Sequence, residues 1–128
     1  MTIFGNLTLG EFIDLLKKTV DNDNPGKCVH FDFMGYSPTT LGSYRGFYDH
    51  CDLDHGPYDF PGRPVAEFVE YLESMIGKNV QSWKSGGYEV QRDRPMWVST
   101  AGECFGTGIV GVKDLNYMTV IETAYLEV

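Results

Sequence analysis

The sequence has little positive charge for a chain of 128 residues. Its 10 lysines and arginines stand against 18 aspartates and glutamates, so the formal net charge at pH 7 is -8. A surface this acidic repels phosphate backbones and anionic lipid headgroups, which argues against duplex nucleic acid and membranes as partners. A basic surface of another protein fits this charge, and so does a small anionic ligand where a few cations converge.

Cysteine is scarce, and long apolar runs are lacking. The three thiols, Cys28, Cys51 and Cys104, are odd in number and have neither metal-site nor redox-motif spacing. Secreted proteins normally pair their thiols, so we expect free thiols and a reducing cytoplasm. Residues 1–10 lack the basic and apolar regions of a signal peptide, and no apolar run approaches the length of a membrane-spanning helix.

Aromatic residues, by contrast, are abundant and make up 14% of the chain. Hydrophobic content is 42%, and the sequence contains no internal repeat, low-complexity tract or linker. These values predict one domain, residues 1–128, that buries enough surface to fold without disulfides. Because a core this small cannot hide every ring, we expect some of the tyrosines to lie at a binding surface.

Two segments have helical periodicity. Thr8 and Glu11 have the spacing of a capping box, and a turn at residues 21–26 ends the helix that follows. A second helix begins near Pro64, and Gly77 ends it. The apolar faces comprise Leu9, Phe12, Ile13, Leu16 and Val20 in the first helix and Val65, Phe68, Val69, Leu72 and Ile76 in the second.

The rest of the chain favours strands. Residues 28–33 alternate with period two, and a hairpin is predicted around Gly86-Gly87. Further strands are expected at 96–100, 108–112 and 117–128, with Val110 and Val120 buried. Residues 34–63, rich in Gly, Pro, Tyr and Asp, predict a long irregular loop that admits one strand near 44–53. This order indicates an α+β fold, with two helices packed on a mostly antiparallel sheet as a single pair of layers.

One dense cluster of potential metal ligands lies in Asp49–His55. On a strand, alternate residues of this segment would share one face, and with His30 and Asp32 they define one alternative, a metal-dependent enzyme. The other interpretation is a solvated loop whose aspartates accept from backbone amides, and the absence of a spacing motif favours it. Cys51 is a poor nucleophile, because neighbouring carboxylates raise the pKa of a thiol. We therefore predict no metal, no cofactor and no catalytic residue.

Two short segments each combine a cation with aromatic rings, namely Ser43–Tyr48 and Lys84–Tyr88. A guanidinium can donate two parallel hydrogen bonds to a phosphate or carboxylate, and a tyrosine ring can stack on a planar base. If the segments meet in space, they form a pocket for a small, anionic, nucleotide-like ligand. Otherwise Arg45 pairs with a carboxylate and the rings complete the core. The candidate ligand-binding residues are Tyr44, Arg45, Tyr48, Lys84 and Tyr88.

Several short motifs also resemble a group of short uncharacterised proteins encoded in tailed-phage genomes. In chain order they are Phe31-Asp32-Phe33, Pro38, Ser43-Tyr44-Arg45-Gly46, Tyr48-Asp49, Gly86-Gly87-Tyr88 and Trp97-Val98. The resemblance covers most of the chain. It implies a protein that acts in the cytoplasm of an infected bacterium, against host defence, and it brings no known activity or catalytic residues.

Taken together, these features favour a non-enzymatic accessory protein of phage type that acts by binding. It would either sequester a small nucleotide-like ligand or inhibit a host defence protein through that protein's basic surface. A metal-dependent enzyme and a structural phage component are the alternatives. A homo-oligomer is compatible as well, because an apolar C-terminal strand suits an interface as much as a core.

Overall fold

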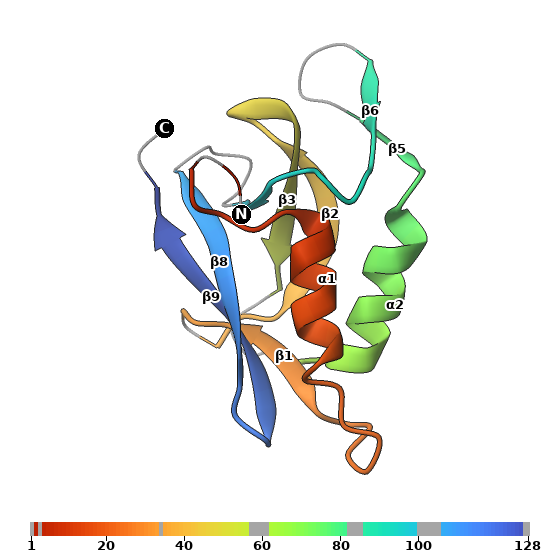
Figure 1. Cartoon of the computed structure of the whole chain (residues 1–128), viewed down its shortest axis with the longest axis vertical. Helices are drawn as coiled ribbons and strands as arrows, with labels where there is room; N and C mark the ends of the chain where they lie inside the picture. The colour runs from red at the N-terminus through yellow and green to blue at the C-terminus, as the bar shows by residue number, and fades with distance from the viewer. Residues whose placement is uncertain are drawn as a thin grey trace.

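The computed structural model describes residues 2, 4–33, 35–56, 62–81, 86–99 and 106–126, with the backbone alone at position 48. These residues form the predicted α+β fold, in which two helices pack on a large, mostly antiparallel sheet (Figure 1). The helices are α1 (Leu9–Lys17) and α2 (Val65–Met75). The strands are β1 (Cys28–Phe31), β2 (Pro38–Tyr44), β3 (Phe47–His55), β4 (Arg63–Pro64), β5 (Asn79–Gln81), β6 (Gly87–Glu89), β7 (Met96–Val98), β8 (Thr107–Asp114) and β9 (Met118–Tyr125).

Both helices form where the apolar periodicity predicts them. The capping box of α1 is confirmed, because Glu11 N donates to Thr8 Oγ1 at 3.2 Å and Thr8 N donates to Glu11 Oε1 at 2.9 Å. Gly77, with φ +89°, ends the second helix. The apolar faces of the helices meet edge to face at Phe12 and Phe68, whose ring centroids are 6.1 Å apart. Within the described part of the chain, neither helix has the length and apolar character needed to span a membrane.

The large sheet has the strand order β2-β3-β7-β8-β9-β1-β4. Only the β3–β7 and β9–β1 pairs are parallel, and β5 and β6 form a separate two-stranded ribbon. One expectation was wrong: the described part of residues 34–63 is not an irregular loop, because it contains the β2–β3 hairpin, with its turn at Arg45-Gly46. Asp and Gly are rare in strands and hid this hairpin, in which Cys51 and Leu53 alternate with aspartates and point into the core.

The large sheet curls until its two edge strands approach each other. Ser37 Oγ donates to Val29 O at 2.8 Å and accepts from Arg63 N at 3.0 Å. The Arg63 guanidinium also reaches across to β2 and donates through Nη1 to Thr39 O. We name this junction between β2 and β4 the seam. Side-chain hydrogen bonds, rather than a strand ladder, close it.

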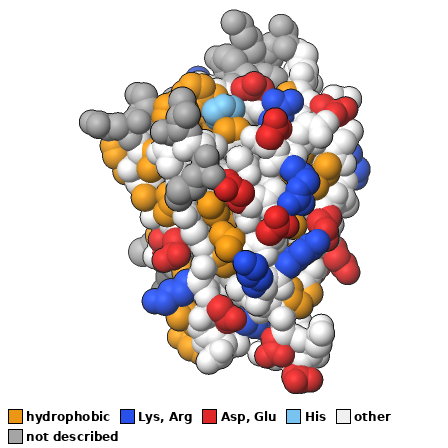
Figure 2. All heavy atoms as spheres, viewed as in Figure 1, with side chains coloured by type: hydrophobic (Ala, Val, Ile, Leu, Met, Phe, Trp, Pro, Cys, Tyr) orange, Lys and Arg blue, Asp and Glu red, His pale blue; other side chains and the backbone are white. Residues whose placement is uncertain are grey.

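The surface over the helices carries charges of both signs. Figure 2 shows acidic side chains interspersed with basic ones on this face. Some of the cations are paired, since Arg92 Nη2 lies 2.9 Å from Asp14 Oδ2 and Lys17 Nζ lies 2.8 Å from Glu73 Oε2. This face therefore offers no obvious cluster of cations for an anionic ligand.

Candidate functional site

Two of the five predicted ligand-binding residues belong to the interior. Tyr44 is 1% exposed, its ring stacks on Trp97 with centroids 4.6 Å apart, and its hydroxyl accepts from Gly106 N at 2.9 Å. Tyr88 is 7% exposed, and its hydroxyl donates to Gly42 O at 2.9 Å. Both rings therefore complete packed regions of the fold.

Of the other three candidates, Arg45 is the one whose side chain the structure describes. Arg45 is exposed in the turn between β2 and β3, whereas Lys84 and the side chain of Tyr48 lie outside the described residues. Tyr44, Arg45 and Tyr88, whose side chains the structure describes, line neither of the two cavities reported below. A ligand pocket at these positions stays a prediction.

The potential metal ligands are engaged in other ways. Asp32 accepts from Thr123 N at 2.8 Å and from Thr123 Oγ1 at 2.6 Å, which links β1 to β9. His50 Nδ1 accepts from Trp97 Nε1 at 3.0 Å. Among the residues that the structure describes, no three His, Cys, Asp or Glu side chains are grouped so that they could hold a metal ion.

Cys51 and Asp52 are adjacent buried residues of β3. Burial raises the pKa of the Cys51 thiol to about 12, so burial, more than the neighbouring carboxylates, makes it a poor nucleophile. Burial, aided by the charge of Asp54, also raises the pKa of Asp52 to about 7, although hydrogen bonds from Ser99 and Gly42 oppose the shift. Neither residue lines one of the two cavities, so both are assigned to the fold rather than to a site.

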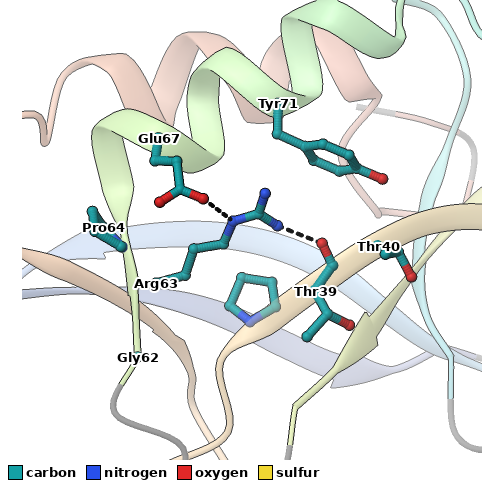
Figure 3. Close-up of a pocket in the computed structure, with 8 residues that line it drawn as sticks. Thr39, Thr40, Gly62, Arg63, Pro64, Glu67 and Tyr71 are labelled. Carbon is teal, nitrogen blue, oxygen red and sulfur yellow. Dashed lines mark hydrogen bonds and ion pairs between the residues drawn. The ribbon is translucent and has the colours of Figure 1, made fainter.

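A concave site lies on the seam, between β2, β4 and α2 (Figure 3). Its volume is about 310 Å³, and we name it the seam groove. The lining residues are Pro38, Thr39, Thr40, Gly62, Arg63, Pro64, Glu67 and Tyr71.

Arg63 is the cation of the seam groove. Its Nε donates to Glu67 Oε1 at 3.3 Å and its Nη1 donates to Thr39 O. The guanidinium carbon lies 4.6 Å from the centre of the Tyr71 ring (Figure 3). This cation–π contact helps to hold the guanidinium group in place. No described residue accepts a hydrogen bond from Nη2, and the side chain is 19% exposed. The guanidinium is thus held in place with donor capacity left over.

Two further residues give the groove a fixed shape. The Tyr71 hydroxyl accepts from Leu41 N at 2.9 Å, which ties α2 to the edge of β2. Gly62 has φ +102°, and a Cβ there would lie 2.9 Å from Cε1 of His30. The conformation and the tight contact both require glycine at this position. The groove is therefore preorganised on both of its sides.

A guanidinium also lies over a tyrosine ring in the seam groove, at Arg63 and Tyr71, which the sequence analysis did not single out. The sequence contained one local signal, the i,i+4 spacing of Arg63 and Glu67 at the start of the second helix. It contained none for the approach of β2, because that approach depends on the curl of the whole sheet.

No protein-family model matches the chain, and neither the curated proteins nor the solved structures contain a match to it. The chemistry of the groove is therefore the basis for assigning a function.

Proposed function

We propose that the protein is a non-enzymatic binding protein whose seam groove takes a small ligand with an oxyanion group and a flat, apolar body. The observation that carries this proposal is the Arg63 guanidinium, which is fixed by Thr39 O and the Tyr71 ring and whose Nη2 donates to none of the described residues. An arginine held in this way binds a carboxylate or a phosphate with little loss of side-chain entropy.

The dimensions and the lining of the groove support a small ligand. A volume of about 310 Å³ lies at the lower end of the range for small-molecule sites, which is roughly 300–1,000 Å³. Pro38 and Pro64 supply rigid apolar walls, and Tyr71 supplies an aromatic ring beside the cation. A nucleotide-like molecule of modest size has both the anionic group and the flat ring that such a groove suits.

Glu67 is the internal competitor of such a ligand. Its side chain is 60% exposed, and it occupies only the Nε edge of Arg63. Exposed ion pairs of this kind contribute about 0–1 kcal/mol, so an incoming oxyanion displaces Glu67 at low cost. The net charge of -8 nevertheless weakens binding of any anion, which makes the position of Arg63 decisive.

The setting for this binder is part of the proposal. The resemblance to short tailed-phage proteins suggests that it acts in an infected bacterium, where it would withhold the ligand from a host process or occupy a host protein. Sequestration by stoichiometric binding requires no catalytic group.

The experiment is a titration of the isotope-labelled protein with phenyl phosphate and benzoate, followed by NMR at Arg63 Nε–H and the Thr39 and Thr40 amides. Benzyl alcohol serves as the neutral control. Arg63→Lys keeps the positive charge but cannot donate two parallel hydrogen bonds. It should weaken binding about 10- to 100-fold, since one charge-assisted hydrogen bond is worth about 1.5–3 kcal/mol.

The more discriminating variant is Glu67→Gln, which leaves the Arg63 contact with Thr39 O in place. Removing the competing charge, worth about 0.2–1 kcal/mol, should tighten binding by up to about fivefold. Glu70→Gln is the matched control, because Glu70 is an exposed residue of the same helix outside the groove. The proposal is overturned if both anions bind no better than benzyl alcohol, or if the Glu67 and Glu70 variants have equal affinities.

A further inference from the structure

A second cavity lies at one end of the curled sheet, outside the seam groove. Its volume is about 340 Å³, and it is lined by Phe33, Tyr36, His55, Val98 and Thr107. His55 and Val98 are the last residues of β3 and β7, which run parallel, and Thr107 is the first residue of β8. Phe33 and Tyr36 follow β1. Residues far apart in the sequence therefore meet in this cavity, which we name the ring pocket.

The rings of the ring pocket form a corner. The centroids of Tyr36 and His55 lie 4.4 Å apart with an interplanar angle of 31°, so these two rings share one general orientation. The Phe33 ring stands at 83° to His55 and at 60° to Tyr36, with centroids 5.8 Å from each. Such a corner offers a ligand ring both a stacking contact and an edge-to-face contact, the two favourable geometries for aromatic groups.

This corner is anchored to the core. Phe33 stacks on Phe31 with centroids 5.0 Å apart and an interplanar angle of 16°, and Phe31 is 2% exposed. The segment that carries Tyr36 is also tied down, because Phe31 N donates to Tyr36 O at 2.7 Å. Rings held in this way lose little freedom when a ligand binds, so the binding energy is not spent on ordering them.

The chemistry of the lining selects the class of ligand. None of the lining residues that the structure describes is a Lys, Arg, Asp or Glu, and the protein as a whole repels anions. The polar groups of the described lining include the imidazole of His55 and the hydroxyl of Thr107, which match the ring nitrogens and carbonyls of a heterocycle. Phe33, Tyr36 and His55 are each only half-buried, so aromatic surface remains accessible beside these polar groups.

We infer that the ring pocket is a second binding site, and that it takes an uncharged planar heterocycle such as a nucleobase. This site is separate from the seam groove, because the two share none of their described lining residues and require opposite properties of the ligand. It also gives His55 a role different from the metal ligation considered for the Asp49–His55 segment.

The test is an NMR titration with adenosine and cytidine, which carry a base but no phosphate, and with ribose as the control that lacks a base. We expect saturable shifts at Val98 and Thr107 with the nucleosides and none with ribose. Phe33→Leu should weaken nucleoside binding about 5- to 150-fold, the range that follows from the loss of one base–aromatic stack. Tyr117→Leu is the matched control, because it removes a ring that is 73% exposed and distant from the lining.

Two further variants keep the inference falsifiable if Phe33→Leu fails to fold. Thr107→Val preserves the side-chain shape and removes one hydroxyl, so it should weaken binding several-fold without unfolding the protein. Arg63→Lys should leave nucleoside affinity unchanged, which separates this inference from the seam groove. No saturable shift with either nucleoside would overturn the inference, and so would shifts that persist unchanged in both the Phe33 and the Thr107 variants.

Discussion

Replacing Asp52 with asparagine should make the protein more stable at pH 8. Asp52 is 5% exposed, and burial together with the charge of Asp54 raises the pKa of its carboxyl to about 7. The folded protein therefore binds this proton more tightly than the unfolded chain does. Stability is highest when the group is protonated, falls as the pH rises from about 4 to about 7, and is constant above that. Asparagine does not titrate, so the variant should not lose stability over this pH range.

The magnitude follows from the size of the shift. Moving a pKa from 3.8 to about 7 corresponds to roughly 4 kcal/mol at high pH, of which more than half develops between pH 5 and pH 8. Asparagine and the protonated carboxyl differ in how well they satisfy the donors of Ser99 and Gly42, and this difference is the same at both pH values. The gain in unfolding free energy at pH 8 should therefore exceed the gain at pH 5 by roughly 2–3 kcal/mol.

Urea denaturation of the parent and the Asp52→Asn variant at pH 5 and pH 8 measures this difference. Asp54→Asn is the matched control, because it removes the same charge from an exposed neighbour. It should lower the pKa of Asp52 only by the part of the shift that the charge of Asp54 causes. Equal effects of Asp52→Asn at the two pH values would refute the reasoning, as would a variant that is less stable at pH 8. The effect of His50 on stability has the opposite pH dependence. Burial lowers the pKa of its imidazole, so its contribution to the unfolding free energy is lost as the pH falls below about 6.5.

Two further predictions test the packing. Gly62→Ala should cost roughly 1–3 kcal/mol, because φ is +102° and the new Cβ would lie 2.9 Å from His30, whereas Gly26→Ala, with open space around it, should change the unfolding free energy by less than about 0.5 kcal/mol. Equal melting temperatures of the two variants would contradict the described wall of the seam groove. In the native protein, Cys28 should be alkylated faster than Cys51, which is buried and whose pKa is raised to about 12. Peptide mapping reports each thiol, and early labelling of Cys51 would contradict its placement in the core.

The sequence predicted the helices well because their information is local. The Thr8 capping box and the apolar stripe behind it fall within a few turns of one segment, and α1 follows them closely. The β2–β3 hairpin was missed for the opposite reason. Its aspartates look like loop residues, and the partners that make Asp52 acceptable in a strand, Ser99 and Gly42, come from elsewhere in the chain.

The inward face of β9 was also assigned incorrectly. Val120, expected to be buried, is only half-buried, as is Val110 in β8, while Ile121 and Thr119 are fully buried. Both faces of β9 carry apolar residues, so alternation alone could not choose between them. The buried position of Thr119 is favoured by a hydrogen bond to a residue that follows α1, since the Thr119 hydroxyl donates to Thr19 Oγ1 at 2.8 Å.

The candidate sites were the hardest to predict, because both are built where the sheet closes on itself. The seam groove needs β2 beside β4, and the ring pocket needs the ends of β3 and β7 beside the residues that follow β1. The sequence identified the residue types, a guanidinium with aromatic rings, but the neighbours of each ring are set by strand order.

The seam also determines how the protein opens. Neighbouring strands within the sheet are joined by backbone ladders, whereas β2 and β4 are joined through the side chains of Ser37 and Arg63, each of whose hydrogen bonds contributes about 1 kcal/mol net. Because local fluctuations break the weakest contacts first, we expect the sheet to open along this line before the backbone ladders separate. Amide hydrogens such as that of Leu41, bonded only to the Tyr71 hydroxyl, then exchange with solvent without global unfolding. A molecule bound across β2 and α2 would hold the sheet closed, and the rate of that exchange would report its presence.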